Sequence, residues 1–377
     1  MNSLKLLLVA PKPPPNGGIS RWTVLLLEWL QGRSGLEVGN VDISPRWRAV
    51  DDLGIPKRLV GGGLQGLRDT WHVWKQLSRF RPQVMHLTTS GSLAALRDVL
   101  FLSLARWFGA KSVYHIRMGR LPDMAGKRNW EWRLLLRAAR RADRVAVLDQ
   151  ASERALQLVL PKERIVRLPN AIDLKALAVG RKESGEWRAE NENHRVLYLG
   201  WVVPTKGVRE LMEAWRQVHA AGWELVVAGP GDDGYQRELA ALAGPEGRVR
   251  FLGNVSYSGA WELVQQADIF VLPTYTEGFP NAILEAMAAG RPIVASAVGA
   301  IPEMLEADTQ RPCGVLIPPR DVSALAGALR RVMADPDLRA ESGRRARAKV
   351  EREYDVETVF PRLVSLWEEL AGQNERG

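Results

Sequence analysis

The sequence predicts an α/β fold made of two doubly wound domains in tandem. Short apolar runs alternate with longer segments of helical periodicity, which is the pattern of βαβ units around mostly parallel sheets. This alternation pauses once, over residues 169–194, and then restarts. The chain is 377 residues long, and single cores stop growing beyond about 250 to 300 residues, so we expect two cores.

In the first half, short apolar runs bounded by turn residues indicate buried strands. The predicted strands are residues 4–10, 37–43, 84–87, 112–115 and 144–148. Apolar residues at helical spacing fill the intervals, and they predict helices at 21–30, 66–80, 92–108, 130–139 and 152–158. Ser20 is a candidate cap for the first helix.

In the second half, the same alternation predicts strands at 195–199, 224–228, 249–252, 269–272 and 293–296. The polar stretch 169–194 lacks a clear period and is predicted to connect the domains. We therefore expect domains at 1–172 and 173–355, with a C-terminal helix at about 356–377 that packs back on the first. Because ligands bind beyond the carboxyl ends of strands in open α/β sheets, two such domains would face one another across a ligand-binding cleft.

The charge of the chain is divided unevenly. The net charge is +9, and residues 1–180 carry +15 whereas residues 181–377 carry −6. The basic half predicts an acidic partner, which could be nucleic acid, an anionic membrane or a phosphorylated substrate. No recognition-helix, RNA-binding or zinc-finger pattern accompanies the charge, so we expect no nucleic acid partner.

The cysteine content and the apolar runs indicate the compartment. Cys313 is the single cysteine, so no intramolecular disulfide can form, and no metal-ligand motif occurs, so we expect no metal site. No apolar run approaches the ~20 residues that span a bilayer. We expect a cytoplasmic protein, with peripheral association with the inner face of the membrane as a hypothesis.

Two loops can approach an anion. Gly17 and Gly18 lie between a predicted strand and helix, where glycine allows close approach of the backbone and the helix amides face outward. Lys206 lies in a Pro/Gly turn after the first strand of the second domain, where a lysine can reach a phosphate. A plain surface turn and a solvated lysine are the alternatives.

The stretch 272–292 carries two carboxylates. Glu277 lies in the loop after a strand, and Glu285 lies about one turn inside the following short helix, which Gly290 ends. Carboxylates accept hydrogen bonds from sugar hydroxyls, and helix amides hold hydroxyls or anions. The alternative is a loop carboxylate near a helix dipole and a solvated helix residue.

Over essentially its whole length the chain resembles the family 4 retaining glycosyltransferases. The resemblance rests on Gly17-Gly18, Pro169-Asn170, Ile172-Asp173, the segments 200–207, 249–253, 267–273 and 314–319, and the E-x7-E frame from Glu277 to Glu285. It implies the GT-B fold of two Rossmann-like domains. It also implies metal-independent, retaining transfer of a sugar from a nucleotide-sugar, UDP- or GDP-linked, to a hydroxyl of a lipid-linked or polysaccharide acceptor, with no other cofactor, in cell-surface glycan biosynthesis.

The resemblance also implies roles for single residues. Glu285 would hold the donor ribose, Glu277 and the backbone that follows it the donor sugar, and Lys206 the diphosphate. The residues assigned to the donor are Gly17, Gly18, Gly200, Lys206, Asn254, Val255, Glu277, Gly278, Phe279, Pro280, Asn281 and Glu285. The residues assigned to catalysis are Glu277, Lys206, Arg117 and His115.

Two positions depart from the family. Trp201 stands where members commonly have a phosphate-binding arginine. The strand segment 113–119 resembles one with histidines on alternate residues, but the second position is Arg117. His115 and Arg117 share one side of a strand, because side chains alternate. Arg117 is therefore a candidate for the missing cation, and His115 contacts the sugar or has a structural role.

The basic half is expected to meet the acceptor side. Residues 127–144 interleave arginines with Trp and Leu, and residues 68–81 carry Trp71 and Trp74. Basic amphipathic helices with Trp suit an anionic interface, and core helices with solvated arginines are the alternative. Two other functions stay open, a GT-B sugar-nucleotide epimerase or hydrolase and a non-catalytic sugar-nucleotide-binding subunit.

Overall fold

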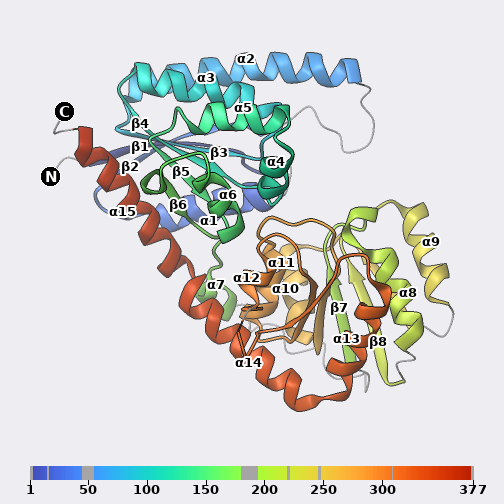
Figure 1. The fold of residues 1–377 in the computed structure, drawn as a ribbon. Coiled ribbons are helices and arrows are strands. Elements are labelled where there is room, and N and C mark those ends of the chain that lie inside the picture. Colours follow the sequence, from blue (N-terminus) through green and yellow to red (C-terminus); the bar gives the residue numbers. More distant parts are fainter. Residues whose placement is uncertain are drawn as a thin grey trace. The chain divides into compact units, whose positions relative to one another are not determined.

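The computed structural model of the protein describes residues 3–14, 17–44, 55–179, 194–218, 221–244, 248–307 and 309–374. The chain forms two compact units (Figure 1). The first unit comprises Met1–Asn170 and Val359–Gly377, and the second comprises Ala171–Thr358. The C-terminal helix therefore begins in the second unit and continues into the first, and the chain passes between the units two residues before the predicted boundary at residue 172.

The first unit is built on a six-stranded parallel sheet with the strand order β2-β1-β3-β4-β5-β6. Its strands are β1 (Leu4–Ala10), β2 (Leu36–Asp42), β3 (Val84–Thr89), β4 (Lys111–Ile116), β5 (Arg144–Val147) and β6 (Ile165–Arg167). Strand β1 is a nearly continuous apolar run that is buried on both faces, as in other parallel sheets covered by helices.

Helices cover both faces of this sheet. They are α1 (Gly18–Leu30), α2 (Ile55–Phe80), α3 (Ala94–Trp107), α4 (Leu121–Lys127), α5 (Trp130–Ala139), α6 (Gln150–Gln157), the 3-10 helix η1 (Lys162–Arg164) and most of α15 (Val356–Asn374). Helices α2, α3 and α5 lie on one face, and α1 and α15 lie on the other (Figure 1). Val73, Phe101 and Leu135 from the first three helices pack in one core with β1, β3 and β4.

The second unit repeats this architecture with the strand order β12-β11-β10-β7-β8-β9, again all parallel. Its strands are β7 (His194–Leu199), β8 (Trp223–Ala228), β9 (Val249–Gly253), β10 (Ile269–Leu272), β11 (Ile293–Ser296) and β12 (Val315–Ile317). The chain proceeds outward from β7 in one direction and from β10 in the other. The switch point of the sheet therefore lies between β7 and β10, where open α/β sheets bind ligands.

The helices of the second unit are α7 (Leu174–Val179), η3 (Pro204–Lys206), α8 (Val208–Val218), α9 (Asp233–Ala243), α10 (Tyr257–Gln266), α11 (Asn281–Ala288), α12 (Ile301–Met304), α13 (Val322–Ala334) and α14 (Pro336–Glu353). Helices α8, α9 and α13 cover one face of the sheet (Figure 1). Helices α10, α11 and α14 cover the other, with α14 packed on α11.

The predicted elements differ from the structure in a few places. Strands β6 and β12 were not predicted, because three residues give no usable pattern. Helix α4 was also missed, and α7 lies inside the stretch predicted as a connection. Ser20 is not the cap of α1: the helix begins after Gly17, and the Ser20 hydroxyl accepts a hydrogen bond from the Gly17 N–H at 2.9 Å.

Candidate active site

The residues predicted to bind a phosphorylated sugar meet at the switch point of the second sheet. Lys206 ends η3, which follows β7, and Glu277 lies in the loop after β10. The Lys206 Nζ and a Glu277 carboxylate oxygen form an ion pair whose side chains are 23% and 15% exposed. The two predicted groups are therefore brought together, and each compensates the charge of the other in a half-buried position.

Two glycines let the loops at this point approach closely. Gly207 has a φ of +69°, and a Cβ there would collide with the carbonyl oxygen of Pro273 after β10. Gly299 has a φ of +57°, and a Cβ there would collide with the carbonyl oxygen of Glu277. The adjacent Ala300 N–H donates to the Gly278 carbonyl at 3.0 Å. Glycine is thus required at both positions, and Gly299, which sequence reasoning missed, supports the backbone of Glu277.

Helix α11 lies directly behind this loop. Pro280 occupies its N-cap position and Asn281 is its first residue, so the first turn of the helix begins four residues after Glu277. Phe279 is buried with its ring edge-on to Tyr354, at 5.3 Å between centroids. Glu285 is only 3% exposed, so the alternative of a solvated helix residue is wrong for Glu285. A buried carboxylate on this helix is expensive to keep unless it is paired or has a binding role.

The other residues predicted for the donor lie at the same end of the sheet. Gly200 follows β7, and its N–H donates to the Ala228 carbonyl at 3.0 Å. Asn254 is exposed and Val255 half-buried, just beyond the end of β9. Trp201 is 42% exposed, and its carbonyl accepts a hydrogen bond from the Tyr198 hydroxyl at 2.8 Å. The loops after β7, β8 and β9 therefore line one edge of the second unit.

In the first unit, Gly17 and Gly18 are exposed at the start of α1, beyond the carboxyl end of β1. Arg117 lies one residue beyond the end of β4 and is only 6% exposed. Its guanidinium lies over the Trp22 ring of α1 at 4.1 Å, and its Nη2 donates to the Asn170 side chain at 2.5 Å. Its Nε and Nη1 are buried and have no hydrogen-bond partner among the described residues. Burial lowers the pKa of Arg117 to about 9.

His115 is fully buried and belongs to a hydrogen-bonded chain. The Trp367 indole N–H of α15 donates to His86 Nδ1 at 3.1 Å, and His86 Nε2 lies 3.2 Å from His115 Nδ1. An indole only donates, so His86 carries its proton on Nε2 and donates it to His115. The His115 ring also packs edge-on against Trp22, at 5.3 Å between centroids. His115 exposes no surface for a sugar here, so its surroundings fit the structural role.

Both histidines are held neutral. Burial, with Arg117 nearby, lowers the pKa of His86 to about 3 and that of His115 well below its usual range. The unfolded chain therefore binds more protons between about pH 3 and 6.5, and stability is lost as the pH falls through that window. We expect the free energy of unfolding of the first unit to fall by about 1.4 kcal/mol per histidine for each pH unit below 6.5.

Urea unfolding between pH 7.5 and 4.5, followed by tryptophan fluorescence, measures this dependence. In His86→Leu, we expect only the part of the pH dependence of the unfolding free energy that is due to His115, although the variant is less stable at every pH. An unchanged slope in that variant would show that His86 is protonated in the folded protein and would contradict the hydrogen-bonded chain.

Each of the two basic stretches predicted for a membrane exposes tryptophan. Within 127–144, α5 buries Trp132, Leu135 and Leu136 and leaves Trp130 56% exposed. Within 68–81, Trp71 and Trp74 of α2 are exposed. No described helix is both long and apolar enough to cross a membrane.

Two family models match the chain. The Glycosyl transferase 4-like domain matches residues 17–171, and Glycosyl transferases group 1 matches residues 150–335. The first match lies mostly on the first unit, and the second includes Lys206, Glu277 and Glu285.

Curated relatives carry the same kind of sequence. The phosphatidyl-myo-inositol mannosyltransferase of Mycolicibacterium smegmatis is 33% identical over 234 residues, which cover 61% of this chain and 58% of that protein. The alpha-D-kanosaminyltransferase of Streptomyces kanamyceticus is 28% identical over 245 residues, 62% of each chain. The chain thus spans less than two thirds of the length of these relatives.

Solved structures match nearly the whole chain. Sucrose-phosphate synthase from Thermosynechococcus elongatus gives a TM-score of 0.78 at 20% identity and covers 98% of this chain and 100% of that one. HepE of Anabaena in complex with UDP gives 0.72 at 21% identity, with 97% and 100% covered. At such identities the likeness concerns the fold, and together with the two parallel sheets it confirms the predicted GT-B class.

Proposed function

The chain belongs to the group 1 glycosyltransferases, and from this premise we propose that it moves a sugar from a nucleotide-sugar to an acceptor hydroxyl. The donor is UDP- or GDP-linked, and the acceptor is lipid-linked or a polysaccharide. The observation that carries the proposal is the Lys206–Glu277 pair at the switch point, with the start of α11 four residues after Glu277. A cation, a carboxylate and a helix N-terminus together match a diphosphate joined to a sugar.

When the donor binds, its own contacts replace the ion pair between Lys206 and Glu277. The diphosphate pairs with Lys206, and the sugar hydroxyls bind Glu277 and the backbone of Gly278, Phe279 and Pro280. Asn281, the first residue of α11, follows these residues in the chain. Glu285 accepts hydrogen bonds from the ribose hydroxyls. Gly17 and Gly18 approach the diphosphate from the first unit. The loops at Gly200 and at Asn254 and Val255 flank the nucleotide.

The reaction is retaining and independent of a metal ion. Breaking the bond between the sugar and the phosphate leaves an oxocarbenium-like sugar and a nucleoside diphosphate, whose new charge the site must stabilise. The acceptor oxygen forms its bond from the face that the leaving group vacates, and a phosphate oxygen takes the acceptor proton. Lys206, Arg117 and the α11 amides carry the charge of the leaving group.

A thermal-shift panel of UDP-, GDP-, ADP- and dTDP-sugars tests the donor, because a ligand that binds only the folded state raises its stability. Product analysis with and without acceptor then separates transfer from the epimerase or hydrolase alternative. The anomeric configuration of the product tests retention, and activity after treatment with a chelator tests metal independence. If no nucleotide-sugar binds, the proposal is wrong.

Arg117 supplies the second cation that Trp201 does not. The support is its burial beside Trp22 with two unpartnered nitrogens, since an incompletely paired buried charge favours a bound anion. We expect Arg117→Gln to lower kcat/KM for transfer at least about tenfold, the usual value of a charge-assisted hydrogen bond. Trp201→Arg in that background is expected to restore part of the loss.

The rescue separates catalysis from folding. Trp201→Arg adds a cation in the second unit and repairs no contact of Arg117 in the first. Arg133→Gln, on the exposed side of α5, is the matched control and should leave kcat/KM unchanged. Failure of Trp201→Arg to raise the activity of Arg117→Gln would assign Arg117 a purely structural role.

The first unit meets the acceptor at the inner face of a membrane. The support is its net charge together with the exposed Trp71 and Trp74 of α2. Tryptophan suits the interface between water and lipid, and arginine and lysine suit anionic headgroups.

A further inference from the structure

One exposed arginine of the second unit has a strained backbone. Arg320 lies in the turn between β12 and α13 with a φ of +65°, in the left-handed region that favours glycine. The next residue, Asp321, caps α13 by accepting a hydrogen bond from the Ala324 N–H at 2.8 Å, so the cap does not depend on Arg320. A costly conformation that is kept by a residue other than glycine points to a role of its side chain.

The Arg320 side chain lies over an aromatic ring of the candidate active site. Its guanidinium carbon is 4.5 Å from the centroid of the Tyr275 ring. Tyr275 is half-buried in the loop after β10, two residues before Glu277. A guanidinium stacked on an aromatic face is a favourable contact that restricts the motion of both groups. The arginine after β12 therefore holds the ring of a residue in the loop that carries Glu277.

The other contacts of Tyr275 join its loop to the loop of Lys206. The Tyr275 backbone N–H donates to the Thr205 carbonyl at 3.0 Å. The hydroxyl donates to a carboxylate oxygen of Glu210 in the first turn of α8, which begins two residues after Lys206. Burial and the bond to Glu210 raise the pKa of Tyr275 to about 12, so the hydroxyl keeps its proton and stays a donor at neutral pH.

The short stretch from Tyr275 to Glu277 is also held. Thr274 is fully buried, and its hydroxyl donates to the Thr276 carbonyl at 3.1 Å, which closes a turn around Tyr275. Together with the Lys206–Glu277 ion pair, these contacts close a ring through both loops. A movement of the Tyr275 ring is therefore transmitted to Glu277.

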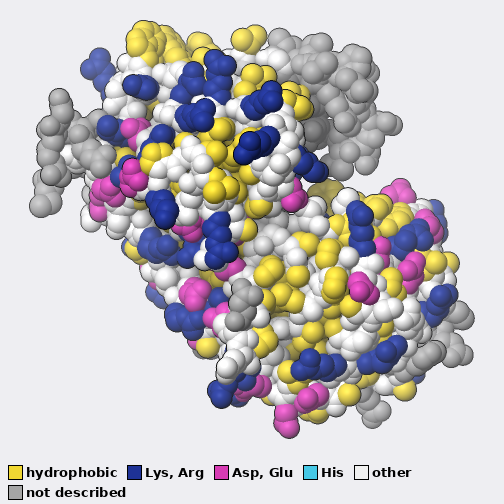
Figure 2. Space-filling model, viewed as in Figure 1, with side chains coloured by type: hydrophobic (Ala, Val, Ile, Leu, Met, Phe, Trp, Pro, Cys, Tyr) yellow, Lys and Arg dark blue, Asp and Glu magenta, His cyan; other side chains and the backbone are white. Residues whose placement is uncertain are grey.

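Arg320 does not belong to a basic patch. Figure 2 shows Lys and Arg interspersed with Asp and Glu over the side of the second unit where Figure 1 places α8, α9 and α13. Arg209 of α8, for example, pairs with Glu238 of α9. Charges of both signs on one face do not attract an anion by their sum. The contact that distinguishes Arg320 is therefore its stack on Tyr275.

We propose that Tyr275, held between Glu210 and Arg320, is a positioning residue for sugar transfer. It fixes the loop of Glu277 against α8, so that the carboxylate meets the donor sugar while Lys206 meets the diphosphate. The strained φ of Arg320 is retained because the stack serves catalysis. The inference rests on the proposed function and deepens it, by naming the residues that set the geometry of the same site.

Steady-state kinetics of the full chain, with the donor identified by thermal shift, test the role of the hydroxyl. Tyr275→Phe keeps the ring and the stack and removes only the bond to Glu210. A misplacement of about 1 Å can cost about 100-fold in rate, so loosening this loop is expected to lower kcat about tenfold. The affinity for the nucleoside diphosphate alone, measured by thermal shift, should stay within about twofold, because the backbone bond to Thr205 keeps Lys206 in place.

Glu210 is the partner in a double-mutant cycle. Glu210→Ala removes the same hydrogen bond as Tyr275→Phe, so the double variant should lose no more activity than the less active of the two single variants. Glu210→Gln keeps an acceptor for the hydroxyl and should lose no more than about threefold in kcat. Losses that multiply in the double variant would show that the two side chains act independently and would contradict the proposal.

Arg320→Gly separates positioning from stability. Glycine adopts a positive φ without strain, so the melting temperature should stay at the wild-type value or rise, whereas loss of the stack should lower kcat about threefold. Arg248→Gly is the matched control, since Arg248 is also exposed, has a φ of +44° and precedes β9 in the same unit. This control should leave kcat unchanged.

Wild-type kcat in both Tyr275→Phe and Arg320→Gly would overturn the proposal. Weaker binding of the nucleoside diphosphate to Arg320→Gly would also overturn it, because Arg320 would then be a ligand of the donor. A loss of kcat that only follows the melting temperature would make Tyr275 a structural residue. Failure of the proposed function is seen separately: no nucleotide-sugar would then bind even the wild type, and the inference would fall with it.

Discussion

Replacing Lys206 by methionine is expected to lower kcat/KM for sugar transfer by about 100-fold or more. Lys206 lies at the switch point of the second sheet, and the described residues of its loop, 200–207, offer no second cation. Loss of one preorganised donor to a developing anion costs about 10²–10³ in rate. Because the leaving diphosphate gains charge in the transition state, we expect kcat to fall more than the affinity for the donor.

Steady-state kinetics with the donor identified by thermal shift measure this effect. Lys175→Met removes a lysine that is 79% exposed on α7 of the same unit, and it should leave kcat within about twofold, since exposed ion pairs contribute little. Lys206→Met also leaves the half-buried Glu277 unpaired, so Lys206→Arg is a second variant that keeps the pair. Wild-type turnover in Lys206→Met would show that a group other than Lys206 stabilises the charge of the leaving group.

The sequence predicted the fold where the burial of an element leaves a strong pattern. Strands β10 and β11 have the predicted bounds, because each is a fully buried apolar run between turn residues. Strand β6 has three residues and only one buried side chain, so nothing in its composition separates it from a loop. Helix α7 was not predicted, because it is short and follows a Pro-Asn turn inside a polar stretch.

The candidate site could be proposed from the sequence where one short segment carries the polar residues. Glu277, Pro280 and Glu285 lie within a single loop and helix, and Lys206 lies in the one Pro/Gly turn after β7. The support of Glu277 by Gly299 was not predictable, since it depends on how closely two loops approach.

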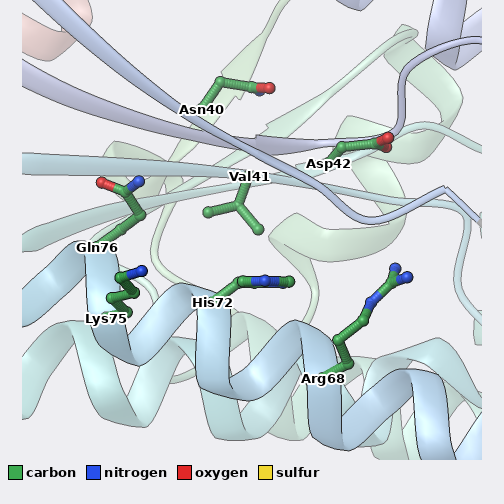
Figure 3. A pocket seen from close by; sticks show the side chains of 7 residues that line it. All are labelled: Asn40, Val41, Asp42, Arg68, His72, Lys75 and Gln76. Carbon is green, nitrogen blue, oxygen red and sulfur yellow. The ribbon is translucent and has the colours of Figure 1, made fainter.

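Contacts between distant segments could not be predicted from the sequence either. His115 depends on His86 and on Trp367, which lies 281 residues from His86 and reaches it only through the packing of α15 on the sheet. A pocket of about 360 Å³ between β2 and α2 of the first unit (Figure 3) likewise joins two elements whose polar residues show no joint pattern along the chain. The charge of the first half indicated an acidic partner, but only the fold shows that Trp132 of α5 is buried whereas Trp71 and Trp74 of α2 are exposed.

Replacing Glu285 by alanine is expected to raise the KM for the donor about 100-fold. A carboxylate that accepts a hydrogen bond from each of the two ribose hydroxyls makes two charge-assisted hydrogen bonds, and their loss costs about 3 kcal/mol of binding free energy. The ribose lies away from the reacting carbon, so its contacts are the same in the ground state and the transition state. We therefore expect kcat to change by no more than a few-fold, which is the opposite signature to that of Lys206→Met.

The burial of Glu285 makes the comparison with glutamine decisive. Glu285 is 3% exposed within the packed helix α11, so alanine opens a small cavity, whereas glutamine keeps the volume and removes only the charge. Glu285→Gln should therefore show an intermediate KM at nearly wild-type stability. Glu213→Ala on α8, a half-buried helix residue of the same unit, should leave KM unchanged. If Glu285→Gln binds the donor like the wild type while Glu285→Ala melts early, Glu285 supports α11 and the ribose is held elsewhere, because only packing would then distinguish the two variants.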